Sequence, residues 1–120
     1  MMKKAGSVLA LNAADNERTG AAILALNSVV DRLERILTEE NAILEAGRLA
    51  SHERFLVHKS QILHEFTALQ QSLSDHRVYS KMSSRLQSIR GLAERNHALL
   101  RSQAEGFAQF MKLPSDAAKD

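Results

Sequence analysis

The side chains best suited to metal binding or acid–base catalysis in this 120-residue chain are its histidines: His52, His58, His64, His76 and His97. A di-iron helical bundle needs inward-facing glutamates and two Glu-x-x-His pairs, because each pair lets one helix supply two ligands. One such pair occurs, Glu94 with His97, and the heptad pattern of its helix places both residues off the apolar seam. We therefore expect a solvated pair, with no metal and no cofactor.

Other catalytic groups lack the local pattern that their chemistry requires. The chain has no cysteine, which excludes thiolate metal sites, cysteine nucleophiles and disulfides. It also lacks the Gly-rich elbow that exposes a nucleophilic serine and the loop that cradles phosphates. The prediction is a protein that is not an enzyme and that works by binding another protein. A metal- or cofactor-binding bundle enzyme is the alternative from another class.

The charge of the chain argues against nucleic acid as the partner. The formal net charge is only +2, whereas a nucleic-acid-binding domain needs a dense basic face. Basic residues do outnumber acidic ones between His76 and Leu113, but the heptad spreads them over several outer positions instead of one stripe. We expect a solubilising surface there.

The elements that position these residues are helices, because the chain has few glycines, a single proline and few aromatic residues. The first predicted helix begins at Asn16 or Thr19 and stops near Gly47. Its apolar seam alternates steps of three and four residues, with Glu40 in the one remaining seam position. The apolar seam residues are Ile23, Leu26, Val30, Leu33, Leu37 and Leu44.

The second predicted helix opens near Ser51, and Lys59 takes one of its seam positions. The polar run from Ser72 to His76 is the best place for the following turn. The other seam residues are Phe55, Ile62, Phe66, Leu69 and Leu73. Leu56 and Leu63 widen this stripe on one flank.

The third predicted helix has the most regular pattern and is expected to be the longest, ending before Pro114. Its seam residues are Met82, Leu86, Ile89, Ala93, Asn96, Leu100, Gln103, Phe107 and Phe110. The polar Asn96 and Gln103 suit either a register-setting layer or a helix that exchanges partners. The predicted fold is all-α: one domain over 1–120, an antiparallel three-helix coiled-coil bundle with a long C-terminal helix. Residues 1–18 are a candidate disordered segment, and 114–120 form a polar tail.

Large apolar side chains gather at the end of the third predicted helix: Leu99, Leu100, Phe107, Phe110, Met111 and Leu113. Because the first helix is expected to be shorter than the third, this end should overhang the bundle. An apolar overhang needs cover. Either a partner protein covers it, or Leu9 and Leu11 of the N-terminal segment fold back over it.

Three stretches of the chain resemble the FlgN family, the flagellar export chaperones for hook-filament junction proteins. They are the Leu/Glu-rich first helix around Leu37 and Leu44, the Lys59 region of the second, and the Leu-Ala-x-x-Asn-x-x-Leu-Leu run that ends at Leu100. The resemblance covers 22–111. It implies a cytoplasmic chaperone of type III secretion without ATPase activity, which holds its client unassembled and hands it to the export apparatus.

In the FlgN family the amphipathic C-terminal helix binds the C-terminal segment of the client. The matching positions here are Leu99, Leu100, Gln103, Phe107, Phe110 and Met111. The chain departs from the family in its short tail beyond Pro114 and its mildly basic balance. A generic coiled-coil adaptor or a self-associating bundle is the alternative, and both monomer and dimer stay open. The N-terminal Lys3 and Lys4 with a short apolar run only faintly imitate a secretion signal, so the expected location is cytoplasmic, without membrane insertion.

Overall fold

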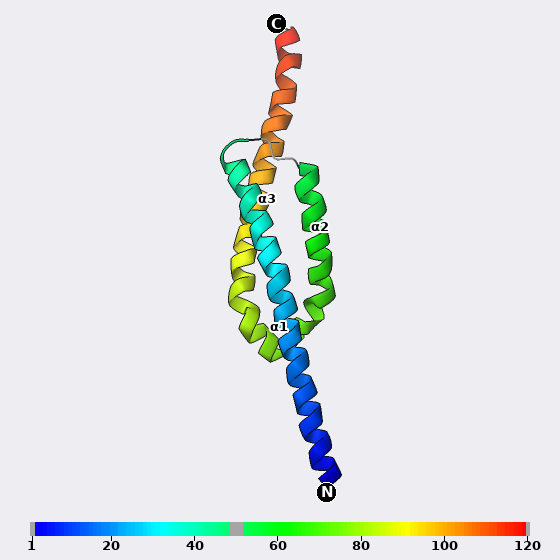
Figure 1. The fold of residues 1–120 in the computed structure, drawn as a ribbon. Coiled ribbons are helices and arrows are strands. Elements are labelled where there is room, and N and C mark those ends of the chain that lie inside the picture. The colour runs from blue at the N-terminus through cyan, green and yellow to red at the C-terminus, as the bar shows by residue number, and fades with distance from the viewer. Residues whose placement is uncertain (1, 49–51, 120) are drawn as a thin grey trace.

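A computed structural model describes the backbone of residues 2–48 and 52–119, and the side chains of 13–48, 53–109, 111 and 112. Helix α1 spans Met2–Glu45, α2 spans His52–Leu69, a 3-10 helix covers Gln70–Ser74, and α3 spans His76–Lys119. None of the described residues forms a strand. The all-α bundle is confirmed, and it has the shape of a rod of 92 × 20 × 18 Å (Figure 1).

The three helices run up, down and up along the rod, with the chain ends at opposite tips (Figure 1). α1 and α3 are therefore parallel, as their ion pairs also show. Arg77 pairs with Asp15 at 2.7 Å, and further along both helices Arg95 pairs with Glu45 at 3.2 Å. Between these pairs, Arg85 reaches Asp31 at 2.6 Å, and this hydrogen bond raises the pKa of Arg85.

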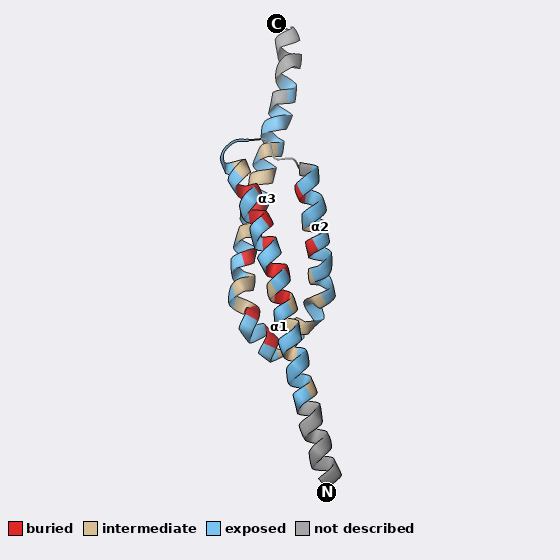
Figure 2. Cartoon of the chain, viewed as in Figure 1, coloured by how far each residue is buried: buried red, intermediate tan, exposed pale blue. Residues whose placement is uncertain are grey.

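The core lies mainly between α1 and α3, with α2 added on one side (Figure 2). The predicted seams supply most of it, together with Val29 and Ile36 on one flank of α1 and Val78 near the start of α3. Burying each such side chain contributes about 1.5–3 kcal/mol to folding. The buried apolar residues are Leu26, Val29, Val30, Leu33, Ile36, Leu37, Phe55, Ile62, Val78, Met82 and Ile89.

The predicted stop at Gly47 is confirmed, and its hydrogen bonds explain it. The Gly47 amide donates to the carbonyl of Leu44 at 3.0 Å, and the Arg48 amide donates to that of Ile43 at 3.2 Å. This pair of bonds satisfies the last carbonyls of α1 and requires a left-handed residue, which Gly47 provides with φ of 73°.

Two predicted helix ends and one predicted length are wrong. α1 begins at Met2 instead of Asn16 or Thr19, so α1 and α3 have the same length of 44 residues. α3 overhangs because α1 ends at Glu45 and α2 starts at His52, and not because α1 is short. α3 also continues through Pro114 to Lys119. A proline removes one backbone donor from a helix, and water can take over the free carbonyl where the helix has no neighbour.

Asp75 connects the 3-10 helix to α3 and caps the N-terminus of α3. Its backbone is extended, and its Oδ1 accepts the backbone amide of Arg77 at 2.9 Å. The Arg77 guanidinium also donates to the carboxylate, at 3.0 Å to Oδ2. These bonds from Arg77 hold the pKa of Asp75 below its usual value of 3.8.

Removing the Asp75 charge should destabilise the fold in a pH-dependent way. We expect thermal midpoints at neutral pH to fall in the order wild type, Asp75→Asn, Asp75→Ala, because Asn keeps a capping oxygen and Ala keeps nothing. Since the native pKa is lowered, the stabilisation is complete above the ordinary value of 3.8 and is lost as the pH falls through the native value. The difference in thermal midpoint between the wild type and Asp75→Asn should therefore shrink only in that acid range.

Circular-dichroism melts across the pH series measure this difference. Glu105→Gln, at an exposed position on α3, serves as the control and should melt with the wild type at neutral pH. A difference in thermal midpoint between the wild type and Asp75→Asn that stays constant into strong acid would show that the charge of Asp75 does not stabilise the fold.

Candidate functional site

Three of the four polar residues on the predicted apolar seams, Glu40, Lys59 and Asn96, meet in one layer of the bundle. The Oε1 atom of Glu40 on α1 accepts a hydrogen bond from Lys59 Nζ on α2 at 2.7 Å. The same oxygen accepts Asn96 Nδ2 from α3, also at 2.7 Å. Glu40 has no exposed surface, and Asn96 is buried. With Asn41, these residues form what we call the polar layer.

The polar layer satisfies most of its own hydrogen-bonding groups. Asn96 Nδ2 also donates to Asn41 Oδ1 at 2.9 Å, and Asn96 Oδ1 accepts from Lys59 Nζ at 3.2 Å. Asn41 Nδ2 then donates to the carbonyl of Leu92 at 3.3 Å. The Oε2 atom of Glu40 is the one buried side-chain oxygen or nitrogen without a protein partner in the described part of the chain.

Sequence reasoning noticed Glu40, Lys59 and Asn96 singly but did not predict that they meet. Each is a polar residue on a seam that is otherwise mostly apolar, and a buried charge is retained only when it is paired. An acid, a base and an amide distributed over three helices are therefore the signal that could have located this layer. Asn96 is hydrogen-bonded to residues of both other helices, as a register-setting residue would be.

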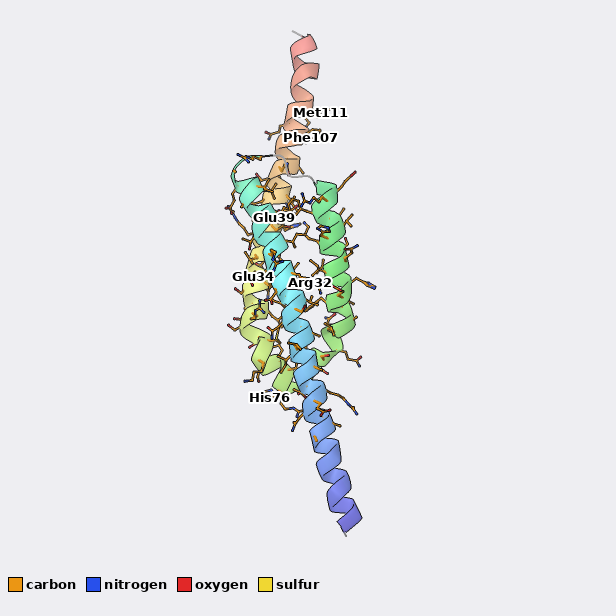
Figure 3. All side chains as sticks on the ribbon, in the orientation of Figure 1. Arg32, Glu34, Glu39, His76, Phe107 and Met111 are labelled. Carbon is orange, nitrogen blue, oxygen red and sulfur yellow. The ribbon has the colours of Figure 1, made fainter. Side chains whose placement is uncertain are left out.

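The six residues predicted to bind a client lie on or below the free end of α3. Every described side chain from Ala104 to Lys112 is exposed, and we call residues 104–119 of α3 the arm (Figure 2). Phe107 and Met111 are 62% and 59% exposed, and both project beyond the turn between α1 and α2 (Figure 3). Leu100 is half-buried below them, and the side chain of Phe110 is outside the described residues.

Leu99 and Gln103 lie below Phe107 and Met111 on α3, beside the end of α1. They line a small groove of about 220 Å³ where the end of α1 meets α3. Leu44, Gly47, Arg48 and Ser102 complete its lining. The groove combines apolar walls with the amide of Gln103, and it opens at the base of the arm.

A larger groove of about 590 Å³ lies between α1 and α2, over the buried Ile36 and Ile62. It brings together His58 and His64, two of the candidate metal ligands. The walls carry both signs of charge, and Arg32 is paired with Glu65 across it at 2.6 Å. Within the described residues, no three His, Asp or Glu side chains gather closely enough to hold a metal ion.

The fold and the arm define the class: an elongated three-helix bundle in which the described end of α3 exposes apolar side chains. Comparison with protein-family models, with curated proteins and with solved structures found no match to this chain. No helix in the described ranges combines the length and the apolar character that crossing a membrane demands.

The polar layer makes a prediction about stability. Lys59→Met leaves the buried Glu40 carboxylate without its cation, so we expect the free energy of unfolding to fall by about 3–5 kcal/mol. Replacing Glu40, Lys59 and Asn96 together by Leu, Met and Leu should restore wild-type stability or exceed it, because no buried charge then remains. Urea denaturation followed by far-UV circular dichroism measures both.

Arg90→Met is the matched control, because Arg90 forms an exposed pair with Glu94 within α3 at 3.0 Å. Such a pair contributes about 0.5 kcal/mol or less. If Lys59→Met and Arg90→Met lowered the free energy of unfolding equally, the loss of a cation from the polar layer would be no more destabilising than the loss of an exposed ion pair.

Proposed function

We propose that this protein is an export chaperone like those of the FlgN family, which binds the C-terminal segment of hook-filament junction proteins and keeps them unassembled for type III secretion. The resemblance of three sequence stretches suggests the client. The observation that carries the proposal is the exposure of large apolar side chains on the arm of α3.

Phe107 and Met111 are neighbours on one side of the arm, because residues four apart share a helix face. Neither α1 nor α2 extends alongside them, since α1 ends at Glu45 and α2 begins at His52. Covering each side chain with an apolar partner would contribute about 1.5–3 kcal/mol to binding. An amphipathic helical segment of a client supplies such cover.

The groove at the base of the arm adds a second contact for the same segment. Leu99 provides an apolar wall, and the Gln103 amide can both donate and accept hydrogen bonds. A client helix lying along the arm would pass beside this groove. The apolar stripe through which the client assembles with other subunits would then be covered. In this way a binding protein can hold a subunit unassembled without catalysis or a cofactor. In this proposal it acts in the cytoplasm and delivers the client to the export apparatus.

The arm gives a direct test by calorimetric titration with the C-terminal segment of a hook-filament junction protein from the same cell, beside a scrambled segment. We expect saturable one-to-one binding of the native segment alone. Phe107→Ser and Met111→Ser should each weaken it at least tenfold, about 1.4 kcal/mol. Thermal midpoints should not change, because both side chains are exposed in the free protein.

Leu24→Ser is the control, since Leu24 is an equally apolar residue on α1 and is 74% exposed. It should bind the segment like the wild type. Absence of binding to the wild type, or full binding by Phe107→Ser, would overturn the proposal. A doubled mass in solution that Phe107→Ser restores to the monomer value would instead favour a self-associating bundle.

A further inference from the structure

The side of the bundle between α2 and α3 exposes apolar residues well below the arm. Leu56 and Leu63 on α2 are 48% and 49% exposed. On α3, Ala93 is exposed although its seam neighbours Ile89 and Asn96 are buried. A seam residue becomes exposed when no neighbouring helix packs over it. With the half-buried Leu86 and Leu100, these residues form what we call the α2–α3 face.

The contacts of α2 and α3 with α1 show which flank of each helix faces α1, and the exposed residues of the α2–α3 face lie on the other flank. Glu65 on α2 reaches Arg32 on α1, so that flank of α2 faces α1. Leu56 and Leu63, seven residues apart, lie on the opposite flank at a helical period of 3.6. On α3, Arg85 reaches α1, and Ala93 lies on the flank turned away from that contact. Leu86, seven residues before Ala93, is half-buried and packs partly against the core.

α2 and α3 are linked to each other far less than either is to α1. Among the described residues, the one hydrogen bond between α2 and α3 joins Lys59 Nζ to Asn96 Oδ1 at 3.2 Å. This contact belongs to the polar layer at the centre of the bundle. Both helices pack mainly on α1, and in the described part of the chain α2 and α3 make little direct contact with each other. Two helices that pack directly lie about 8–10 Å apart along their contact.

The α2–α3 face is continuous with the apolar side of the arm. Leu86, Ala93, Leu100 and Phe107 follow one another at intervals of seven residues along α3, and Met111 extends the line by one turn. From Leu86 to Phe107 this stripe is roughly 30 Å long. A heptad stripe of this length is what one further helix needs to pack along α3.

Charge beside the stripe favours an acidic helix as the occupant. Most basic residues of α3 are already paired with acids of α1 or of α3 itself. Lys81, Arg101 and Lys112 have no acidic partner within the described residues. Arg101 and Lys112 are eleven residues apart, which places them on the same side of α3 next to the stripe. Glu105 shares this side, but Arg101 and Lys112 together outweigh its charge. Carboxylates flanking the apolar stripe of an incoming helix would meet them.

We propose that the α2–α3 face receives the client segment as a fourth helix, which runs from the arm down along α3 and packs between Leu63 and Ala93. The inference rests on the proposed function and adds the course and chemistry of the client: an amphipathic helix with a heptad apolar stripe flanked by carboxylates. The bundle is then completed by its client, and the arm is only the first part of the contact.

Because the chain has no cysteine, a single introduced thiol reports on one position. We would measure maleimide alkylation of Ala93→Cys, on the α2–α3 face, and of Ala104→Cys, on the arm, with and without saturating client segment. Thr38→Cys, an exposed position on α1, is the control. The client should slow the reaction at least tenfold at both alanine positions and leave Thr38→Cys unchanged.

Protection of Ala104→Cys without protection of Ala93→Cys would overturn the inference and leave the proposed function intact. If the client neither binds nor protects any position, both fall. Protection of Ala93→Cys that rises with protein concentration in the absence of client would show a second copy on this face, which also overturns the inference.

A matched pair of substitutions on α2 tests the same contact by affinity. Leu63→Ser should weaken client binding at least fivefold, whereas Val57→Ser should have no effect. The two residues have similar exposure, 49% and 54%, but only Leu63 belongs to the α2–α3 face. Equal affinities for the two variants would contradict the proposed course of the client.

Discussion

The pairing of one buried carboxylate governs how the three helices of this bundle meet. Glu40 has no contact with solvent, and it is compensated by a cation from α2 and an amide from α3. A buried charge without these partners would cost several kcal/mol, a large share of the roughly 5–15 kcal/mol that stabilises a domain. Only one register of α2 and α3 on α1 brings both partners to the same oxygen.

The same interaction explains why the bundle is well ordered around α1 and open between α2 and α3. A lysine reaches the central carboxylate through four methylene groups, so α2 can be held without close backbone approach to α3. The apolar flanks of α2 and α3 then remain partly exposed, as Leu63 and Ala93 show. The contact that fixes the register thus leaves room on one side, and the proposed fourth helix fills that side.

The heptad pattern was sufficient to predict the fold class, the seams and the stop at Gly47, because each depends on local periodicity or on one residue's conformational freedom. The start of α1 and the passage of α3 through Pro114 were not predictable, since local signals for helix ends compete there with helix continuation. The exposure of Phe107 and Met111 on an overhanging helix end was foreseen from apolar type and spacing. The polar layer was missed because it exists only once three separate seams are placed in register.

The polar layer has a consequence for how the sequence can drift. Glu40, Lys59 and Asn96 are separated widely along the chain, but each is tolerated in the core only through the other two. A homologue in which one of them has become apolar should carry compensating changes at the other two. These three positions should therefore covary as a set. In an alignment of homologues, covariation among these polar positions would report which residues of the three helices are in contact, whereas the interchangeable leucines of the seams would not.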